Sequence, residues 1–220
     1  VTATATSSFR WLNWLGHVLV KNVEVEIGGQ RIDKHYGDWL HIWNELTQTA
    51  GHQSGYANMV GNVPRLTQVA SGAGVSTPQT TLYVPLQFWF CRNPGLALPL
   101  IALQYHEVKL NLEFRPKTDC YWSHTNDGGA AASVGSLTGA SLYVDYIYLD
   151  TDERRRFAQV SHEYLIEQLQ FTGDESTNST QPKVKLNFNH PCKELVWVVQ
   201  PDRNVDSNSD NAGGKQWFNY

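Results

Sequence analysis

Residues 18–47 read VLVKNVEVEIGGQRIDKHYGDWLHIWNELT, and this stretch contains two periodicities in succession. Within 18–27, valine and isoleucine alternate with glutamate, which is the period of two of a strand with one buried and one solvated face. The pair Gly28-Gly29 follows, and both positions tolerate the positive φ that a two-residue hairpin turn requires. The stretch therefore predicts a strand, a tight turn and a returning extended segment.

The second part of the stretch has the period of a helix. Aromatic and aliphatic side chains recur at spacings of three and four from Tyr36 to Leu46. Asp38 stands where an N-cap or first-turn acid is favoured, and Gly51 is a candidate for the helix end. We expect one amphipathic helix over 36–49.

Further apolar or alternating runs predict strands, and long polar loops separate them. The run LYVPLQFWFC is apolar on nearly every residue, although Pro85 places it near an edge or a bulge. The charged run at 150–156, DTDERRR, indicates a solvated face and a domain junction. The expected strands cover 82–91, 105–114, 140–149, 184–188 and 195–199, and the expected loops cover 51–79, 117–139 and 202–214. This pattern predicts an all-β chain, a sandwich or jelly roll with one or two short helices.

Composition excludes several classes of protein. The 220 residues include 41% hydrophobic, 12% aromatic and only 17% charged residues, which argues against disorder throughout the chain. The net charge of -4 argues against binding to nucleic acid or to an anionic membrane through overall charge. No run of 18 apolar residues exists, so we expect no membrane insertion. The sequence has three cysteines, Cys91, Cys120 and Cys192. Because their number is odd and their spacing shows no pairs, we expect free thiols in a cytosolic setting.

The residue patterns of enzymes and metal sites are missing from the sequence. His35 and His41 are six apart, which is not a ligand spacing, and no nucleophile elbow, P-loop or dinucleotide-binding motif occurs. We therefore predict no enzyme, no catalytic residues, no metal ligands and no cofactor. Asn178 lies in the sequon Asn-Ser-Thr and is the single candidate for modification, by glycosylation.

One alternative remains open from the residues alone. Glu24 and Glu26 lie on one strand face, and paired carboxylates can perform acid-base chemistry on a glycan. Together with the aromatic content, they keep a carbohydrate-binding module or glycan hydrolase on a β-sandwich as the rival hypothesis.

The stretch Val23–Thr47 resembles the major capsid protein of nucleocytoplasmic large DNA viruses, in its algal-virus and iridovirus branch. The resemblance continues, in the order that the family has it, through about half of the chain. Its further parts are VPLQFWFCRNPGLALPLIALQYHEVKL at 84–110, YVDYIYLDTDERRRFAQ and HEYLIEQLQ within 143–170, and LNFNHP at 186–191. Long matches in fixed order are more specific than any short motif.

The resemblance implies a double jelly roll, two antiparallel β-sandwiches side by side. On that basis we expect residues 1–155 to form most of a first jelly roll whose opening strands are missing. Residues 156–220 would form the junction and the truncated opening of a second jelly roll, so that the chain is a central fragment.

The resemblance also implies function and partners. The chain would be a structural subunit of trimeric, pseudo-hexagonal capsomers in the icosahedral shell of a large DNA virus. Its partners would be further copies of itself, neighbouring capsomers and minor capsid proteins, without direct contact to nucleic acid. It would act in the virion after assembly in the host cytoplasm.

Overall fold

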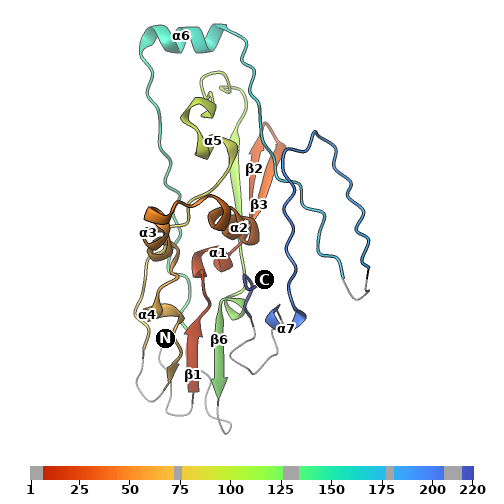
Figure 1. Ribbon diagram of the computed structural model, residues 1–220. Coiled ribbons are helices and arrows are strands. Elements are labelled where there is room, and N and C mark those ends of the chain that lie inside the picture. Colours follow the sequence, from red (N-terminus) through yellow and green to blue (C-terminus); the bar gives the residue numbers. More distant parts are fainter. Residues whose placement is uncertain (1–6, 72–75, 126–133, 177–180, 206–214) are drawn as a thin grey trace.

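The computed structural model describes residues 7–71, 76–125, 134–176, 181–205 and 215–220. Two three-stranded antiparallel sheets form its β structure, and helices pack beside them (Figure 1). The first sheet has the order β4-β1-β6 and the second has the order β3-β2-β5. The strands are β1 (Ser7–Trp11), β2 (Val20–Ile27), β3 (Gln30–Tyr36), β4 (Ala70–Ser71), β5 (Val108–Phe114) and β6 (Tyr121–Thr125).

The hairpin predicted at the head of the sequence is present as β2 and β3. Gly28 and Gly29 have φ values of 60° and 80°, so the turn uses the conformational freedom that only glycine has without strain. Ile27 pairs with Gln30 beside the turn, and a bulge shifts the register between Val25 and Glu26. The alternation in β2 is confirmed, because its valines at 23 and 25 are buried.

β5 pairs with the other edge of β2, so that Val25 lies opposite Leu110. The expected strand at 105–114 is therefore confirmed for its main part. Its inward face is only partly covered, because Leu112 keeps 45% of its surface exposed.

Short helices are more numerous than the sequence pattern predicted. In the described ranges they are α1 (Leu15–Leu19), α2 (Gly37–Thr47), α3 (Ala50–Val60), α4 (Pro64–Thr67), α5 (Trp89–Arg92), α6 (Thr151–Gln159) and α7 (Asp202–Val205), with 3-10 turns η1 (Pro94–Leu96) and η2 (Lys117–Asp119). The helix predicted over 36–49 is confirmed as α2, with Asp38 in its first turn. The prediction that Gly51 ends it was wrong, because Gly51 lies inside α3 and Gln48 is the C-cap of α2.

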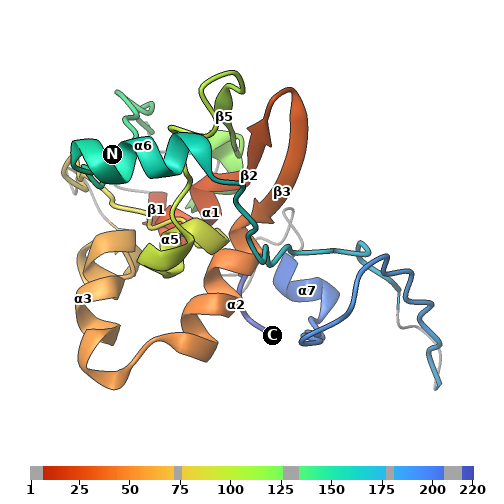
Figure 2. The same cartoon turned by 90° about the horizontal axis from the view of Figure 1, so that it is seen from above.

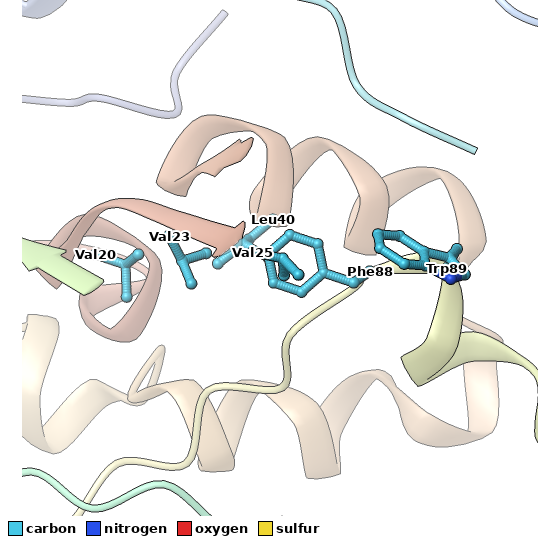
Figure 3. Packing of buried hydrophobic residues seen from close by; sticks show 6 residues of the cluster. All are labelled: Val20, Val23, Val25, Leu40, Phe88 and Trp89. Carbon is cyan, nitrogen blue, oxygen red and sulfur yellow. The ribbon is translucent and has the colours of Figure 1, made fainter. Parts of the chain in front are cut away.

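Two apolar clusters hold the helices to the sheets. The first joins β2 to α2 and α5 through Val20, Val23, Val25, Leu40, Phe88 and Trp89 (Figure 3). The second joins α1 to β6 and to residues 217–218; its buried members are Leu12, Leu15, Val18, Cys120 and Trp122. Gly37, at the start of α2, lies directly against backbone carbonyls of α1 and β2, so helix and hairpin approach as closely as a missing side chain allows.

Several predicted elements differ from the structure. The stretch 82–88 is irregular and ends in α5, while α3 and β6 occupy parts of the expected loops at 51–79 and 117–139. The charged run belongs to the exposed helix α6, which confirms its solvated character (Figure 2).

The strands expected at 140–149, 184–188 and 195–199 are not formed. An extended segment becomes a strand only when its N–H and C=O groups pair with a neighbouring strand. No described residue provides such a ladder for these three segments. Figures 1 and 2 both show the blue segment from 181 to 188 lying apart from the two sheets.

Candidate functional site

A strap formed by residues 164–171 crosses the first half of the molecule at β3. The Leu169 amide donates to Asp33 Oδ1 at 3.1 Å, and Gln168 Nε2 donates to the Ile32 carbonyl at 2.5 Å. The ring of Phe171 lies 5.3 Å from that of Tyr36. Contacts across some 136 residues of sequence therefore fix the strap to the edge of the β3-β2-β5 sheet.

Asp33 is the buried anchor of this strap. Its side chain is 1% exposed, and its Oδ2 lies 3.0 Å from His35 Nε2 on the same strand face. The Leu169 amide supplies one of the donors that this buried side chain needs, so the strap offsets part of its desolvation cost.

Glu167 fastens the strap at a second point. Its carboxylate pairs with Arg92 Nη2 at 3.0 Å and also accepts from Lys193 Nζ. The hydrogen bond from Lys193, followed by the charge of Arg92, lowers the pKa of Glu167, so the carboxylate stays ionised. The guanidinium of Arg92 lies 4.6 Å from the Trp43 ring, which ties the ion pair to α2.

Large apolar side chains gather on the extended segments on either side of the strap. Tyr148 is 92% exposed and Trp197 is 81% exposed. Folded monomers seldom leave so many large apolar side chains of one segment in water. The exposed side chains are Leu142, Tyr143, Val144, Tyr146, Ile147 and Tyr148 in one segment, and Leu195, Val196, Trp197, Val198 and Val199 in the other.

The two glutamates behind the carbohydrate-active hypothesis contact side chains of neighbouring strands. Glu24 Oε1 lies 2.7 Å from Lys34 Nζ and 3.6 Å from Arg31 Nη1, both on β3. Glu26 accepts from Asn111 Nδ2 on β5 at 3.3 Å. The two glutamates therefore take part in cross-strand contacts of the kind that stabilise a sheet.

The remaining predicted site residues are dispersed. Asn178 lies outside the described residues. Cys91 and Cys192 are exposed and Cys120 is buried, where burial raises the pKa of its thiol to about 11. No group of three metal-ligating side chains occurs in the described residues, and their helices are too short and too polar to cross a membrane.

Sequence reasoning missed Asp33, Arg92 and Glu167. One signal was available, because Asp33 and His35 occupy the inward phase of β3, where an apolar residue would be expected. Polar residues at buried positions usually have specific partners. Nothing in the sequence, however, identified that partner as the backbone of Leu169.

Comparison with known proteins gives two family matches that together cover nearly the whole chain. Residues 1–150 match the family "Major capsid protein N-terminus", and residues 153–220 match "Large eukaryotic DNA virus major capsid protein".

Individual relatives agree with these matches. The major capsid protein of Pyramimonas orientalis virus is 69% identical over 185 residues, which cover 84% of this chain and 43% of the relative. That of Phaeocystis pouchetii virus is 56% identical over 243 residues, covering 96% of this chain and 47% of the relative. The chain thus spans less than half the length of these curated relatives.

Solved structures show the same relationship. A quasi-atomic model of the PBCV-1 virus capsid superimposes with a TM-score of 0.60 at 39% identity, covering 84% of this chain and 46% of that one. The crystal structure of PBCV-1 VP54, fitted into a reconstruction of the virophage Sputnik, gives a TM-score of 0.55 at 40% identity and covers 76% of this chain and 40% of that chain. The expected fold class, the double jelly roll, is confirmed by these similarities, and a carbohydrate-active protein is not favoured.

Proposed function

The chain belongs to the major capsid protein family of large eukaryotic DNA viruses, and we propose on this basis that the protein is a structural subunit of trimeric, pseudo-hexagonal capsomers in an icosahedral shell. The observation that carries the proposal is the pair of adjoining family matches over 1–150 and 153–220. Relatives named as major capsid proteins, at up to 69% identity, support it.

The physical basis of this function is burial of apolar surface. Each Å² of apolar area removed from water contributes about 25 cal/mol, and permanent interfaces commonly bury 2,000 Å² or more. The exposed apolar segments at 142–148 and 195–199 are surface that the rest of the full-length subunit or a neighbouring copy would bury. Association around a closed rotation axis then limits the assembly to a defined number of copies.

The two family matches also support a division of the chain into two parts. We infer that residues 1–155 belong to the first jelly roll and that 156–220 begin the second. α6 spans this boundary and has no buried residues. The strap at 164–171 would then fasten the second part to the first through Asp33 and Arg92.

Partners and location follow from the same proposal. The subunit acts in the virion, where it contacts further copies of itself, neighbouring capsomers and minor capsid proteins. Its assembly takes place in the host cytoplasm. Catalysis is no part of this proposal, and the paired glutamates 24 and 26 are engaged in cross-strand contacts instead. Turnover on a glycan, ester or phosphate panel that disappears in the double variant Glu24→Ala, Glu26→Ala would contradict this.

The experiment is to purify the full-length protein and measure its mass by light scattering over micromolar concentrations. A trimer is expected, and electron micrographs of it should show pseudo-hexagonal particles. A monomer at every concentration contradicts the proposal. Saturable glycan binding by that monomer would instead support the carbohydrate-binding alternative.

A further inference from the structure

The helix α6 lies at one end of the molecule, where two extended segments join it to the rest (Figure 1). None of its nine residues is buried. A helix of this length is marginal in water on its own, because most helical stability in proteins comes from packing of one face. A partner that covers one side of α6 would therefore stabilise it.

One side of α6 combines apolar and charged side chains. Glu153, Arg156 and Phe157 stand at positions i, i+3 and i+4, and Val160, the C-cap, follows at i+7. Residues with this spacing lie on the same side of a helix. Together with His162 they line an open hollow of about 260 Å³. These five residues are called the α6 face below.

The apolar part of the α6 face is held in a fixed orientation. The ring of His162 stacks on that of Phe157, with centroids 5.0 Å apart. His162 Nε2 also lies 2.7 Å from the Phe157 carbonyl oxygen, so the chain folds back on the last turn of the helix. Phe157 remains partly exposed, and Val160 is 53% exposed. An aromatic ring that is already fixed loses little entropy when a partner covers it, which makes it a good anchor at an interface.

The charged part of the α6 face has no partner within the described ranges. Glu153 and Arg156 are both exposed, and neither forms an ion pair with another described side chain. The ion pair within the helix joins Asp152 and Arg155 instead, at 3.3 Å. One acid, one base and an apolar pair are therefore available on the same side of α6.

The charges of α6 change sign along the helix, which favours a second copy of the chain as the partner. Asp152 and Glu153 stand in the first turn, and three arginines at 154–156 follow. Two antiparallel copies set the acidic end of each helix against the basic end of the other. Such a contact is isologous, because a two-fold axis brings the same patch of both subunits together. A uniformly acidic or basic partner would match only one end.

We propose that the α6 face binds the α6 face of a second copy in a neighbouring capsomer, antiparallel and across a two-fold axis. The inference rests on the proposed trimer, because subunits that are closed around a three-fold axis need a different contact to join the next capsomer. Phe157 of each copy enters the hollow of the other, where the methylene stems of Glu153 and Arg156 cover it. The two Glu153–Arg156 pairs fix the direction and register of the helices.

The contact is weak for one pair of helices and becomes effective by repetition. A helix of nine residues is about 14 Å long and offers far less than the roughly 800 Å² per partner of a standard interface. Exposed ion pairs add little, and salt screens them. A trimer presents the α6 face three times, so that contacts reinforce one another between assembled capsomers. We therefore expect association between trimers that rises with protein concentration and falls with salt.

The test is sedimentation equilibrium of the full-length protein in low salt, with charge-reversed variants. Glu153→Arg makes the α6 face basic and Arg156→Glu makes it acidic. Each variant alone should weaken association between trimers by about 10- to 30-fold, because two attractive pairs become two repulsive ones. An equimolar mixture of the two should restore the association, because basic faces then meet acidic faces. The control Arg154→Glu, on another side of the same helix, should change it far less.

The possible outcomes separate this inference from the proposed function. A chain that stays monomeric contradicts the proposed function and the inference with it. Trimers that do not associate further at the highest soluble concentration overturn the inference alone, and so does a mixture that associates no better than either variant. If charge reversal lowers the melting temperature of the trimer without changing its association, the rest of the subunit covers the α6 face and the inference is wrong.

Discussion

The close approach of α2 to its neighbours makes Gly37 the most informative position for a single methyl group. A Cβ at Gly37 would lie 2.2 Å from the His17 carbonyl oxygen and 2.5 Å from that of Val20. Both obstacles are backbone atoms, so no side-chain rotation relieves the overlap. The substitution Gly37→Ala therefore requires α2 to move away from α1 and β2.

The cost can be worked out from the contacts that this movement opens. Relief of the overlap requires a shift of roughly 1 Å, because real Cβ atoms essentially never approach closer than 3.0 Å. A gap of that size forfeits about a quarter to a half of the dispersion energy of the side chains it separates, Leu40 first among them. With an overpacking cost of about 1–3 kcal/mol, the loss is about 2–4 kcal/mol. A cooperative unit of about 200 residues then melts roughly 5–15 °C lower.

The assay is calorimetry of the full-length protein, with Gly55→Ala as the matched control. Gly55 lies inside α3, where a Cβ would meet nothing within 4 Å. The same chemical change should there raise stability by about 0.5–1 kcal/mol, because alanine loses less backbone entropy in a helix. If Gly37→Ala melts at or above the wild-type temperature, the packing of α2 against backbone carbonyls is not as described.

Two further predictions concern the strap and the thiols. Asp33→Ala removes the buried acceptor of the Leu169 amide, so hydrogen exchange at that amide should accelerate by about 10- to 100-fold, as expected for a lost hydrogen bond to a charged group; exchange at the wild-type rate would show that the strap does not depend on it. Mass spectrometry without reduction should find three free thiols, and alkylation should modify Cys91 and Cys192 before Cys120, which is buried; fastest labelling of Cys120 would contradict its position.

The sequence predicted helices and strands correctly where periodicity was strong and local. The β2–β3 hairpin and α2 follow from alternation, from a glycine pair and from a helical stripe, all within 30 residues. α3 was missed because only Tyr56 and Val60 of its eleven residues are buried, so it has no apolar stripe to recognise. The segment 140–149 has strand periodicity, but no described neighbour completes its ladder, and a period alone does not supply one.

The contacts of the candidate site could not be predicted from local patterns, because they join residues far apart in the sequence. Asp33 and Leu169 are 136 residues apart, and the ion pair of Arg92 with Glu167 spans 75. The contact between His41 and Phe218 shows the same limit. His41 occurs at a helix position suited to an apolar residue, yet only the fold brings Phe218 onto its ring.

The central position of β2 has a consequence for the order in which the chain folds during synthesis. β3 follows β2 after two residues, whereas β5 begins at Val108, about 80 residues beyond Ile27. At a translation rate of about 5–20 residues per second, the ribosome completes the hairpin roughly 4–16 seconds before β5 emerges. Hairpins form in microseconds, so during this interval the nascent chain carries an unpaired edge on β2. That open edge is a template for pairing with another chain until β5 covers it.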